Sequence, residues 1–331
     1  VLDGNGAGDT SNVIAAIDFA VARRAQYGIR VINLSLGHPV FESYRTDPLC
    51  AAVQRAVDAS IVVVAAAGNR GKTADGRKIV GGIDAPGHCL TALTVGATNT
   101  KQTAGPSDDV MATYSSRGLT LDGLLKPELS APGNRIVSAA AHKSALMTAY
   151  PERVKAGEGS HAYMELSGTS MAAAVVSGAV ALLLEARPEL TPEDVKLALQ
   201  LTSSRLKGAG LIEVGSGTLN VAAAVLLVRG ATAQQLALGG EFVAPSGVFF
   251  THRTNSTYVG SLSSQLPVWS ALDPRGDAPR SSPASIVWTD SIVWTDSIVW
   301  TDSIVWTDSI VWTDSIVWTD SIVWTDSYAG D

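Results

Sequence analysis

The chain has 331 residues, with 24 basic side chains against 31 acidic ones and a formal net charge of −7. A tail at residues 285–326 repeats Ser-Ile-Val-Trp-Thr-Asp seven times and holds seven of the acids, seven of the eight tryptophans and no lysine or arginine. The body without this tail has 24 acids and 24 bases and is therefore neutral. Nucleic-acid-binding proteins usually carry a cluster of basic residues, and this neutral body has none. We therefore expect no nucleic-acid partner.

The composition also limits the class of protein. With 46% hydrophobic and 17% charged residues, the body can bury a substantial core. The longest apolar stretch, residues 171–184, is too short to span a bilayer, so no transmembrane segment is expected. Cys50 and Cys89 are interpreted as buried small hydrophobes rather than a bridge or a metal site. The chain begins at Val1 without an initiator methionine or a signal peptide, and we interpret it as a fragment.

The first 200 residues alternate short apolar runs with amphipathic stretches. Helix-cap residues at Asp9 and Asp47-Pro48 open two predicted helices, and Thr191-Pro192-Glu193-Asp194 is a capping box that opens a third. The predicted helices cover residues 10–28, 47–57 and 192 onward, and buried strands are predicted at 29–34, 61–66 and 91–95. This order predicts an α/β fold with a mostly parallel sheet and helices on both faces.

The pattern changes beyond residue 229. We expect one domain at residues 1–229, a small extension and Pro/Ser-rich linker at 230–284, the repeats at 285–326 and a short terminus at 327–331. Because the repeat length is even, an extended tail would keep Ile, Trp and Asp on one face. The hypotheses for the tail are stacked strands or a small solenoid, a segment that contacts a surface or other chains, and disorder.

Two polar residues lie where chemistry is expected. Ser170 directly precedes the apolar run, at the first turn of a predicted buried helix, where free N–H groups and the helix dipole would stabilise an oxyanion. By position alone, a helix cap is the simpler interpretation of this serine. Asn69 follows the strand at 61–66, where sites of parallel sheets lie, although asparagine is also a common turn residue.

Five segments together resemble the subtilisin-like serine proteases. They are Asn33-Leu34-Ser35-Leu36-Gly37, Ala66-Ala67-Gly68-Asn69, Ser115-Ser116-Arg117-Gly118, Lys126-Pro127-Glu128 with Ala131-Pro132-Gly133, and Gly168-Thr169-Ser170-Met171-Ala172, in the order and spacing of that family. The resemblance covers residues 1 to about 228 and excludes the tail. It implies a three-layer subtilisin-like fold, incomplete at the N-terminus, and a serine endopeptidase that works through an acyl-enzyme. It also implies an extracellular or cell-surface location.

The resemblance assigns roles residue by residue. Ser170 matches the nucleophile and Asn69 the side-chain donor of the oxyanion hole. Gly6-Ala7-Gly8 and Ser35-Leu36-Gly37 match the two segments that hold an extended peptide as an added strand, and the segment 81–86 borders the pocket for the residue before the cleaved bond. Ala66, Ala67, Gly68 and Thr169 complete the predicted peptide-binding residues. The chemistry requires no cofactor, and a structural calcium ion is compatible with the resemblance, although the sequence assigns no metal ligand.

The chain departs from the family pattern at two places. The family runs Asp, His, Ser along the chain, and neither the aspartate strand nor the histidine helix is matched here, which places both upstream of Val1. His161 is the one tempting substitute, and an exposed loop histidine is the simpler interpretation. Because a serine without a base is a poor nucleophile, we expect this chain alone to be inactive. Ala174 stands where the family usually has proline, which relaxes the start of the helix.

Three functions remain open at this point. The first is an endopeptidase represented by the later part of its catalytic domain. The second is a non-catalytic, peptide-binding relative that lacks the acid and the base. The third is a surface or adhesive protein in which the repeats dominate.

Overall fold

A computed structural model describes residues 1, 3, 7–141, 144–156, 162–231, 236–253 and 256–261, with side chains through residue 250. The repeat tail, its linker and His161 lie outside these residues, so the predictions made for them stay predictions. The helices are α1 (Thr10–Tyr27), α2 (Pro48–Asp58), α3 (Ala145–Ala149), α4 (Thr169–Ala186), α5 (Pro192–Thr202), α6 (Leu211–Val214) and α7 (Val221–Val228), with 3-10 turns η1 (Pro106–Asp108) and η2 (Pro151–Arg153).

The strands form a central sheet and several small ones. The central sheet has the order β1 (Val31–Leu34), β2 (Val62–Ala66), β3 (Leu93–Asn99) and β4 (Val110–Met111), and β7 (Leu129–Pro132) also pairs with β3. All of these pairings are parallel except β3 with β4. The small sheets join β5 (Gly118–Leu119) to β6 (Leu125–Lys126), β10 (Ala162–Leu166) to β8 (Ile136–Ala139) and β9 (Val154–Ala156), β11 (Leu236–Leu238) to β12 (Glu241–Val243), and β13 (Val248–Arg253) to β14 (Ser256–Ser261).

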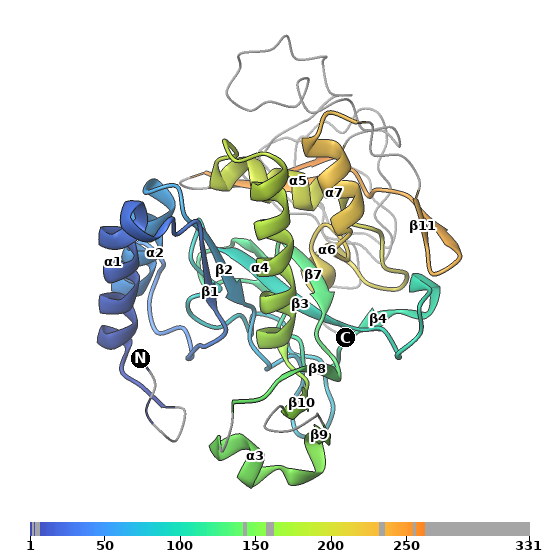
Figure 1. Ribbon diagram of the computed structural model, residues 1–331, viewed down its shortest axis with the longest axis horizontal. Helices are drawn as coiled ribbons and strands as arrows, with labels where there is room; N and C mark the ends of the chain where they lie inside the picture. Colours follow the sequence, from blue (N-terminus) through green and yellow to red (C-terminus); the bar gives the residue numbers. More distant parts are fainter. Residues whose placement is uncertain are drawn as a thin grey trace, which may run out of the picture.

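Helices cover both faces of the central sheet (Figure 1). Strand β2 shows why, because its side chains alternate between the faces. Val62, Val64 and Ala66 pack in the cluster that contains α4, α5 and α7, whereas Val63 and Ala65 pack in the cluster that contains α1 and α2. The predicted α/β fold with a mostly parallel sheet and helices on both faces is confirmed.

The helix boundaries follow the predicted signals. Gly28 ends α1 in the left-handed conformation at φ 64°, and Asp47 caps α2 by accepting a hydrogen bond from the N–H of Leu49 at 2.7 Å. Thr191 and Asp194 form the predicted capping box of α5. Each of these signals is local, so the sequence alone specifies where these helices begin or end.

One expectation about an individual element was wrong. Strand β1 was expected to be buried, but it is the edge of the central sheet among the described residues, so Val31 and Ile32 are half-buried and Asn33 is exposed. Helix α4 has 18 residues and exceeds the predicted apolar stretch, so among the described helices it alone has the length and composition of a membrane span. It packs against β1, β2, β3 and β7 and serves as the core helix of the sheet.

The extension beyond residue 229 packs onto the body through β13. The main chain of Phe250 is held by Gln200 of α5: the Phe250 N–H donates to Oε1 at 2.7 Å, and Nε2 donates to the Phe250 carbonyl at 3.2 Å. The Phe250 ring is buried with Leu125 and Val248. Both polar atoms of the buried Gln200 side chain therefore have a partner, and the pair of bonds fixes where β13 meets the body.

Candidate active site

Ser170 is the second residue of α4, and Gly168 is the N-cap. The interpretation of Ser170 as the helix cap is therefore wrong. Its Oγ donates a long hydrogen bond of 3.4 Å to the carbonyl of Ser35, and the Ser35 hydroxyl donates to the Ser170 carbonyl at 2.8 Å. The hydroxyl is thus held at the carboxyl end of β1, at the first turn of α4, where the helix dipole is positive.

Asn69 lies beside the same helix start. Its Oδ1 accepts hydrogen bonds from the N–H of Thr169 at 3.0 Å and from the Thr169 hydroxyl at 3.2 Å. A backbone N–H can only donate, so the atom facing it must be the oxygen of the amide, which fixes the amide orientation. The Nδ2 group is left as a free donor among the described residues. An oxyanion donor next to a nucleophilic serine needs this orientation.

The strand end that carries Asn69 is tied to α4 by its neighbours. The N–H of Gly68 donates to the hydroxyl of Thr169 at 3.1 Å. Gly68 has a φ of 104°, which glycine adopts without strain. The structure therefore brings together five predicted residues from three segments of the chain: Ser35, Gly68, Asn69, Thr169 and Ser170.

A second contact positions the start of α4. The N–H of Gly168 donates to the carbonyl of Gly133 at 2.8 Å, and the hydroxyl of Tyr114 donates to the same carbonyl at 2.8 Å. Burial raises the pKa of Tyr114 to about 12, so the phenol remains a protonated donor at neutral pH. A β-carbon on Gly133 would lie 2.8 Å from the Gly168 carbonyl oxygen, so only glycine permits this approach.

The structure leaves other predicted residues apart from this cluster. Ala7 and Gly8 lie exposed before α1, and Gly6 lies outside the described residues. No hydrogen bond among the described residues joins Ala7 or Gly8 to the segment at 35–37. Leu36 is half-buried and Gly37 is exposed. Ala66 and Ala67 are buried at the end of β2.

No histidine or carboxylate contacts Ser170 Oγ in the part of the chain that the structure describes. His38 Nδ1 lies 2.7 Å from the carbonyl of Pro39, and His88 is fully buried elsewhere. His161, the candidate substitute, lies outside the described residues. Helix α4 runs without interruption past Ala174, which is exposed.

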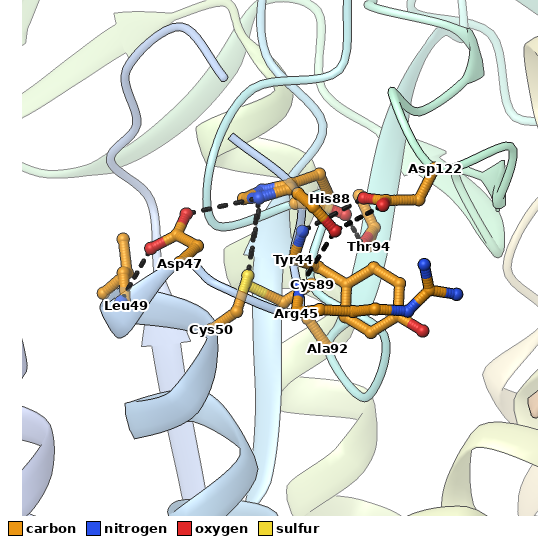
Figure 2. Close-up of a disulfide and its surroundings, with 12 residues drawn as sticks. Tyr44, Arg45, Asp47, Leu49, Cys50, His88, Cys89, Ala92, Thr94 and Asp122 are labelled. Carbon is orange, nitrogen blue, oxygen red and sulfur yellow. Dashed lines mark hydrogen bonds and ion pairs between the residues drawn. A yellow bond between two sulfur atoms is a disulfide. The ribbon is translucent and has the colours of Figure 1, made fainter. Parts of the chain in front are cut away.

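The loop at residues 81–92 is tied to α2 by a disulfide (Figure 2). Cys50 of α2 bonds to Cys89, so the interpretation of these residues as free buried thiols was wrong. Their separation of 39 residues along the chain carries no signal of contact, because only the fold brings them together. Donor atoms of both cysteines and His88 lie within 4.8 Å of one another. The disulfide leaves no thiolate to bind a metal ion there.

His88 sits beside this disulfide and is fully buried. Burial lowers its pKa, and the nearby Asp47 carboxylate opposes this only in part. The imidazole is therefore neutral at neutral pH. Its Nε2 lies 3.2 Å from Asp47 Oδ2, so a neutral imidazole protonated there donates a hydrogen bond to the carboxylate rather than forming an ion pair. Asp47 thus both caps α2 and holds the loop.

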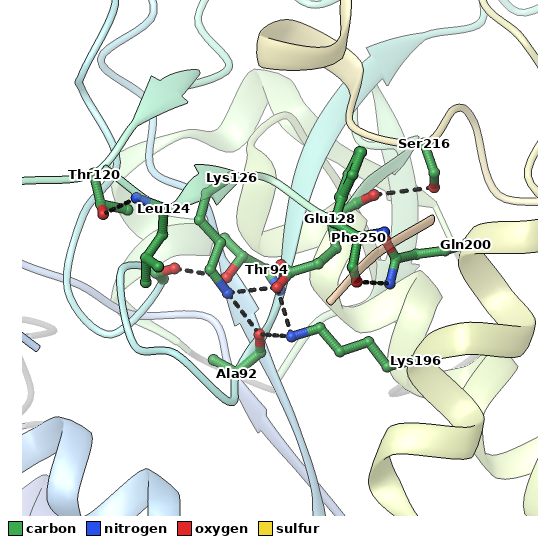
Figure 3. A network of polar contacts seen from close by, with 11 residues as sticks. Ala92, Thr94, Thr120, Leu124, Lys126, Glu128, Lys196, Gln200, Ser216 and Phe250 are labelled. Atoms are coloured by element: carbon green, nitrogen blue, oxygen red, sulfur yellow. Dashed lines mark hydrogen bonds and ion pairs between the residues drawn. The ribbon is translucent and has the colours of Figure 1, made fainter. Parts of the chain in front are cut away.

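A buried ionic network ties the same loop to the sheet and to α5 (Figure 3). Oε1 of the fully buried Glu128 lies 2.5 Å from Lys126 Nζ and 2.6 Å from Lys196 Nζ. Both lysines also donate to the carbonyl of Ala92, at 2.9 and 3.1 Å. Burial lowers the pKa of Lys126 to about 7, and Glu128 opposes this shift. The network therefore anchors one end of the loop.

Thr94 links that network to the middle of the loop. Its N–H donates to Oε2 of Glu128 at 2.7 Å, and its hydroxyl donates to the carbonyl of Gly87 at 2.6 Å. A β-carbon on Gly87 would lie 2.8 Å from the carbonyl oxygen of Ala66, so the loop packs directly against the end of β2. The loop is thus held from three sides, by α2, β3 and α5.

Asp84 of this loop is a residue that sequence reasoning missed. Its N–H donates to the carbonyl of Ala67 at 2.9 Å, and its carboxylate forms an ion pair with Arg70. The side chain of Asp84 is 15% exposed, whereas that of Arg70 is 45% exposed. The available signal was an acidic residue inside the segment 81–86, which the resemblance places at the border of a substrate pocket.

The fold and this geometry agree with comparisons to known proteins. The model of the subtilase family matches residues 1–220. The chain belongs to the subtilase family. Serine protease AprX of Bacillus subtilis (strain 168) is 34% identical over 230 residues, which cover 66% of this chain and 49% of AprX. Subtilisin DY of Bacillus licheniformis is 33% identical over 224 residues, which cover 68% of this chain and 65% of that protein.

Among solved structures, Sphericase aligns with this subtilase at a TM-score of 0.51 and 26% identity, covering 67% of this chain and 66% of that one. The aligned part of this chain spans about half the length of AprX and less than two thirds of subtilisin DY. The predicted family and fold class are therefore confirmed.

Proposed function

We propose that this subtilase chain is the later part of the catalytic domain of a serine endopeptidase. Ser170 is its nucleophile, and the Nδ2 of Asn69 donates to the oxyanion together with the N–H of Ser170. The observation that carries the proposal is the orientation of the Asn69 amide, whose oxygen accepts two hydrogen bonds from Thr169. An asparagine needed only as a turn residue would not require this arrangement next to a serine.

The substrate is an extended peptide or protein segment. Ser35, Leu36 and Gly37 follow strand β1, and Ala67, Gly68 and Asn69 follow strand β2, which pairs with β1 in parallel. A peptide that adds to such a segment gains main-chain hydrogen bonds irrespective of its sequence, and side-chain pockets then set preference. No cofactor takes part in the chemistry. The relatives include one named extracellular serine proteinase, from Thermus sp. (strain Rt41A), which supports an extracellular or cell-surface location.

The chain alone is inactive in this proposal, because no base reaches Ser170 among the residues that the structure describes. The hydroxyl faces a carbonyl, which can accept its hydrogen bond but cannot take up its proton. Strand β1 pairs on one side only within the described residues. A segment upstream of Val1 that lies along this edge would stand next to Ser35 and Ser170, and could supply the missing acid and base.

The test compares two forms of the protein, residues 1–331 alone and the encoded chain extended upstream of Val1. We expect peptide hydrolysis only in the extended form. Ser170→Ala should abolish it, and Ser177→Ala, seven residues along the same helix, should retain it. If residues 1–331 alone hydrolysed a peptide and Ser170→Ala removed that activity, the proposal that this chain lacks a catalytic base would be wrong. A gene that encodes no Asp and His segments upstream would favour a non-catalytic, peptide-binding relative.

A further inference from the structure

Asp84 lies in a loop between the segment that follows β1 and the segment that follows β2. The N–H of His38 donates to the carbonyl of Ala85 at 3.1 Å, and the N–H of Ala85 donates back at 2.9 Å. The N–H of Asp84 donates to Ala67 on the other side. The loop therefore lies between the segment after β1 and the segment after β2, and it is hydrogen-bonded to both.

The Asp84 side chain fills the space between two glycines. A β-carbon on Gly37 would lie 3.3 Å from Cβ of Asp84, and one on Gly68 would clash with the Oδ2 of its carboxylate. Gly68 directly precedes Asn69, the proposed oxyanion donor. The carboxylate thus lies against the backbone that carries Asn69, within the segment 81–86 that the resemblance places at the border of the pocket for the residue before the cleaved bond.

This carboxylate needs a cation. Its Oδ1 is buried and receives no hydrogen bond among the described residues, so the Arg70 guanidinium is the partner that offsets its charge. A largely buried carboxylate without a counterion is strongly disfavoured. Arg70 can leave this position readily, because almost half of its side chain is exposed to solvent.

We propose that Asp84 makes this site selective for peptides with arginine or lysine immediately before the cleaved bond, and that Arg70 occupies the position of that basic side chain in the absence of substrate. The inference rests on the proposed function. In serine proteases a carboxylate at the base of this pocket selects basic side chains. A basic substrate side chain replaces Arg70 and leaves Asp84 paired, whereas an apolar side chain that displaces Arg70 leaves the carboxylate without a partner.

The loop is held firmly enough for this role. The disulfide at Cys89, the Thr94 bond to Gly87 and the two lysines on Ala92 fix it at three points. A charge that is fixed before binding loses little entropy when it meets its partner. The selectivity therefore comes from a preorganised carboxylate rather than from one that must find its position.

The test measures binding, so it does not depend on turnover. Labelled four-residue peptide amides that differ only at the last residue, arginine, leucine or glutamate, are titrated by fluorescence anisotropy against the 331-residue chain carrying Ser170→Ala. We expect the arginine peptide to bind about tenfold more tightly than the leucine peptide, which corresponds to about 1.4 kcal/mol. Asp84→Asn should remove this preference. Asp75→Asn, which removes the same charge from the exposed pair with Arg77, should keep it.

A second variant covers the case in which Asp84→Asn fails to fold, as judged by circular dichroism. Arg70→Gln leaves Asp84 in place and removes its internal partner, so it should tighten binding of the arginine peptide and leave the glutamate peptide weak. An arginine preference that survives Asp84→Asn, or an Arg70→Gln variant that does not gain affinity, would overturn the inference alone. A chain that binds none of the peptides would overturn the proposed function as well.

Discussion

The contribution of the disulfide between Cys50 and Cys89 to the free energy of unfolding can be calculated from the length of the loop that it closes. The bond closes a loop of about 40 residues, since its cysteines are 39 positions apart. The chain-entropy relation for such a loop gives about 4 kcal/mol of stabilisation at 25 °C, because the cross-link limits the unfolded chain. We therefore expect the double variant Cys50→Ala/Cys89→Ala to lose about 3–4 kcal/mol in the free energy of unfolding.

Urea unfolding followed by circular dichroism measures this loss. The unfolded chain without the cross-link is more expanded, so the dependence of the free energy of unfolding on urea concentration should also increase. The double variant provides its own control, because a reductant should destabilise the parent chain and leave the variant unchanged. A loss below about 1 kcal/mol with an unchanged urea dependence would refute the reasoning, since the unfolded chain would then gain no freedom from losing the bond.

Three further predictions follow from buried charges. Burial lowers the folded-state pKa of His88 below its usual 6.5. The contribution of His88 to the free energy of unfolding should therefore be fully present above about pH 6.5 and decrease below it, as the unfolded chain takes up a proton. His88→Gln should flatten this pH dependence in urea titrations at a series of pH values. Burial, followed by the charges of Asp108 and Glu241, raises the pKa of Asp109 to about 6, so the folded chain loses stability as pH rises from about 4 to above 6, and Asp109→Asn should stabilise it at pH 7.5 by about 2–3 kcal/mol. An Asp109→Asn variant with a melting temperature at or below that of the parent would contradict the assignment. Glu128→Gln leaves the buried Lys126 and the partly buried Lys196 without their carboxylate and should cost about 3–5 kcal/mol. Adding Lys126→Met should recover part of that loss. Equal stability of Glu128→Gln and the parent would show that this network is not a source of stability.

Local signals in the sequence predicted much of the fold. The capping box at Thr191 and Asp194 and the caps at Gly28 and Asp47 depend on residues within a few positions of each other, so the sequence contains them entirely. The expectation for β1 failed for a different reason. Its Val-Ile-Asn-Leu sequence has the composition of a buried strand, but burial depends on which strands lie beside it in the sheet.

In the candidate site, too, the sequence predicted some features, whereas others depend on tertiary packing. The family pattern predicted Ser170 and Asn69, and the structure brings them together. The orientation of the Asn69 amide depends on Thr169, which lies 100 residues further along the chain, and the partner of Cys50 lies 39 residues away. The sequence placed Asp84 in the segment 81–86 but did not predict its contacts, because its position between Gly37 and Gly68 depends on how three separate segments pack together.

The three attachments of the loop at 81–92 also separate two properties of the site. They act at Gly87, Cys89 and Ala92, all after Asp84, and none of them involves α4 or the Asn69 amide. Substitutions at position 84 can therefore change which peptides bind while the attachments and the reacting groups stay as they are. Substitutions at position 84 should therefore be tolerated better than substitutions at Gly87 or Cys89, and this makes position 84 a practical starting point for altering selectivity.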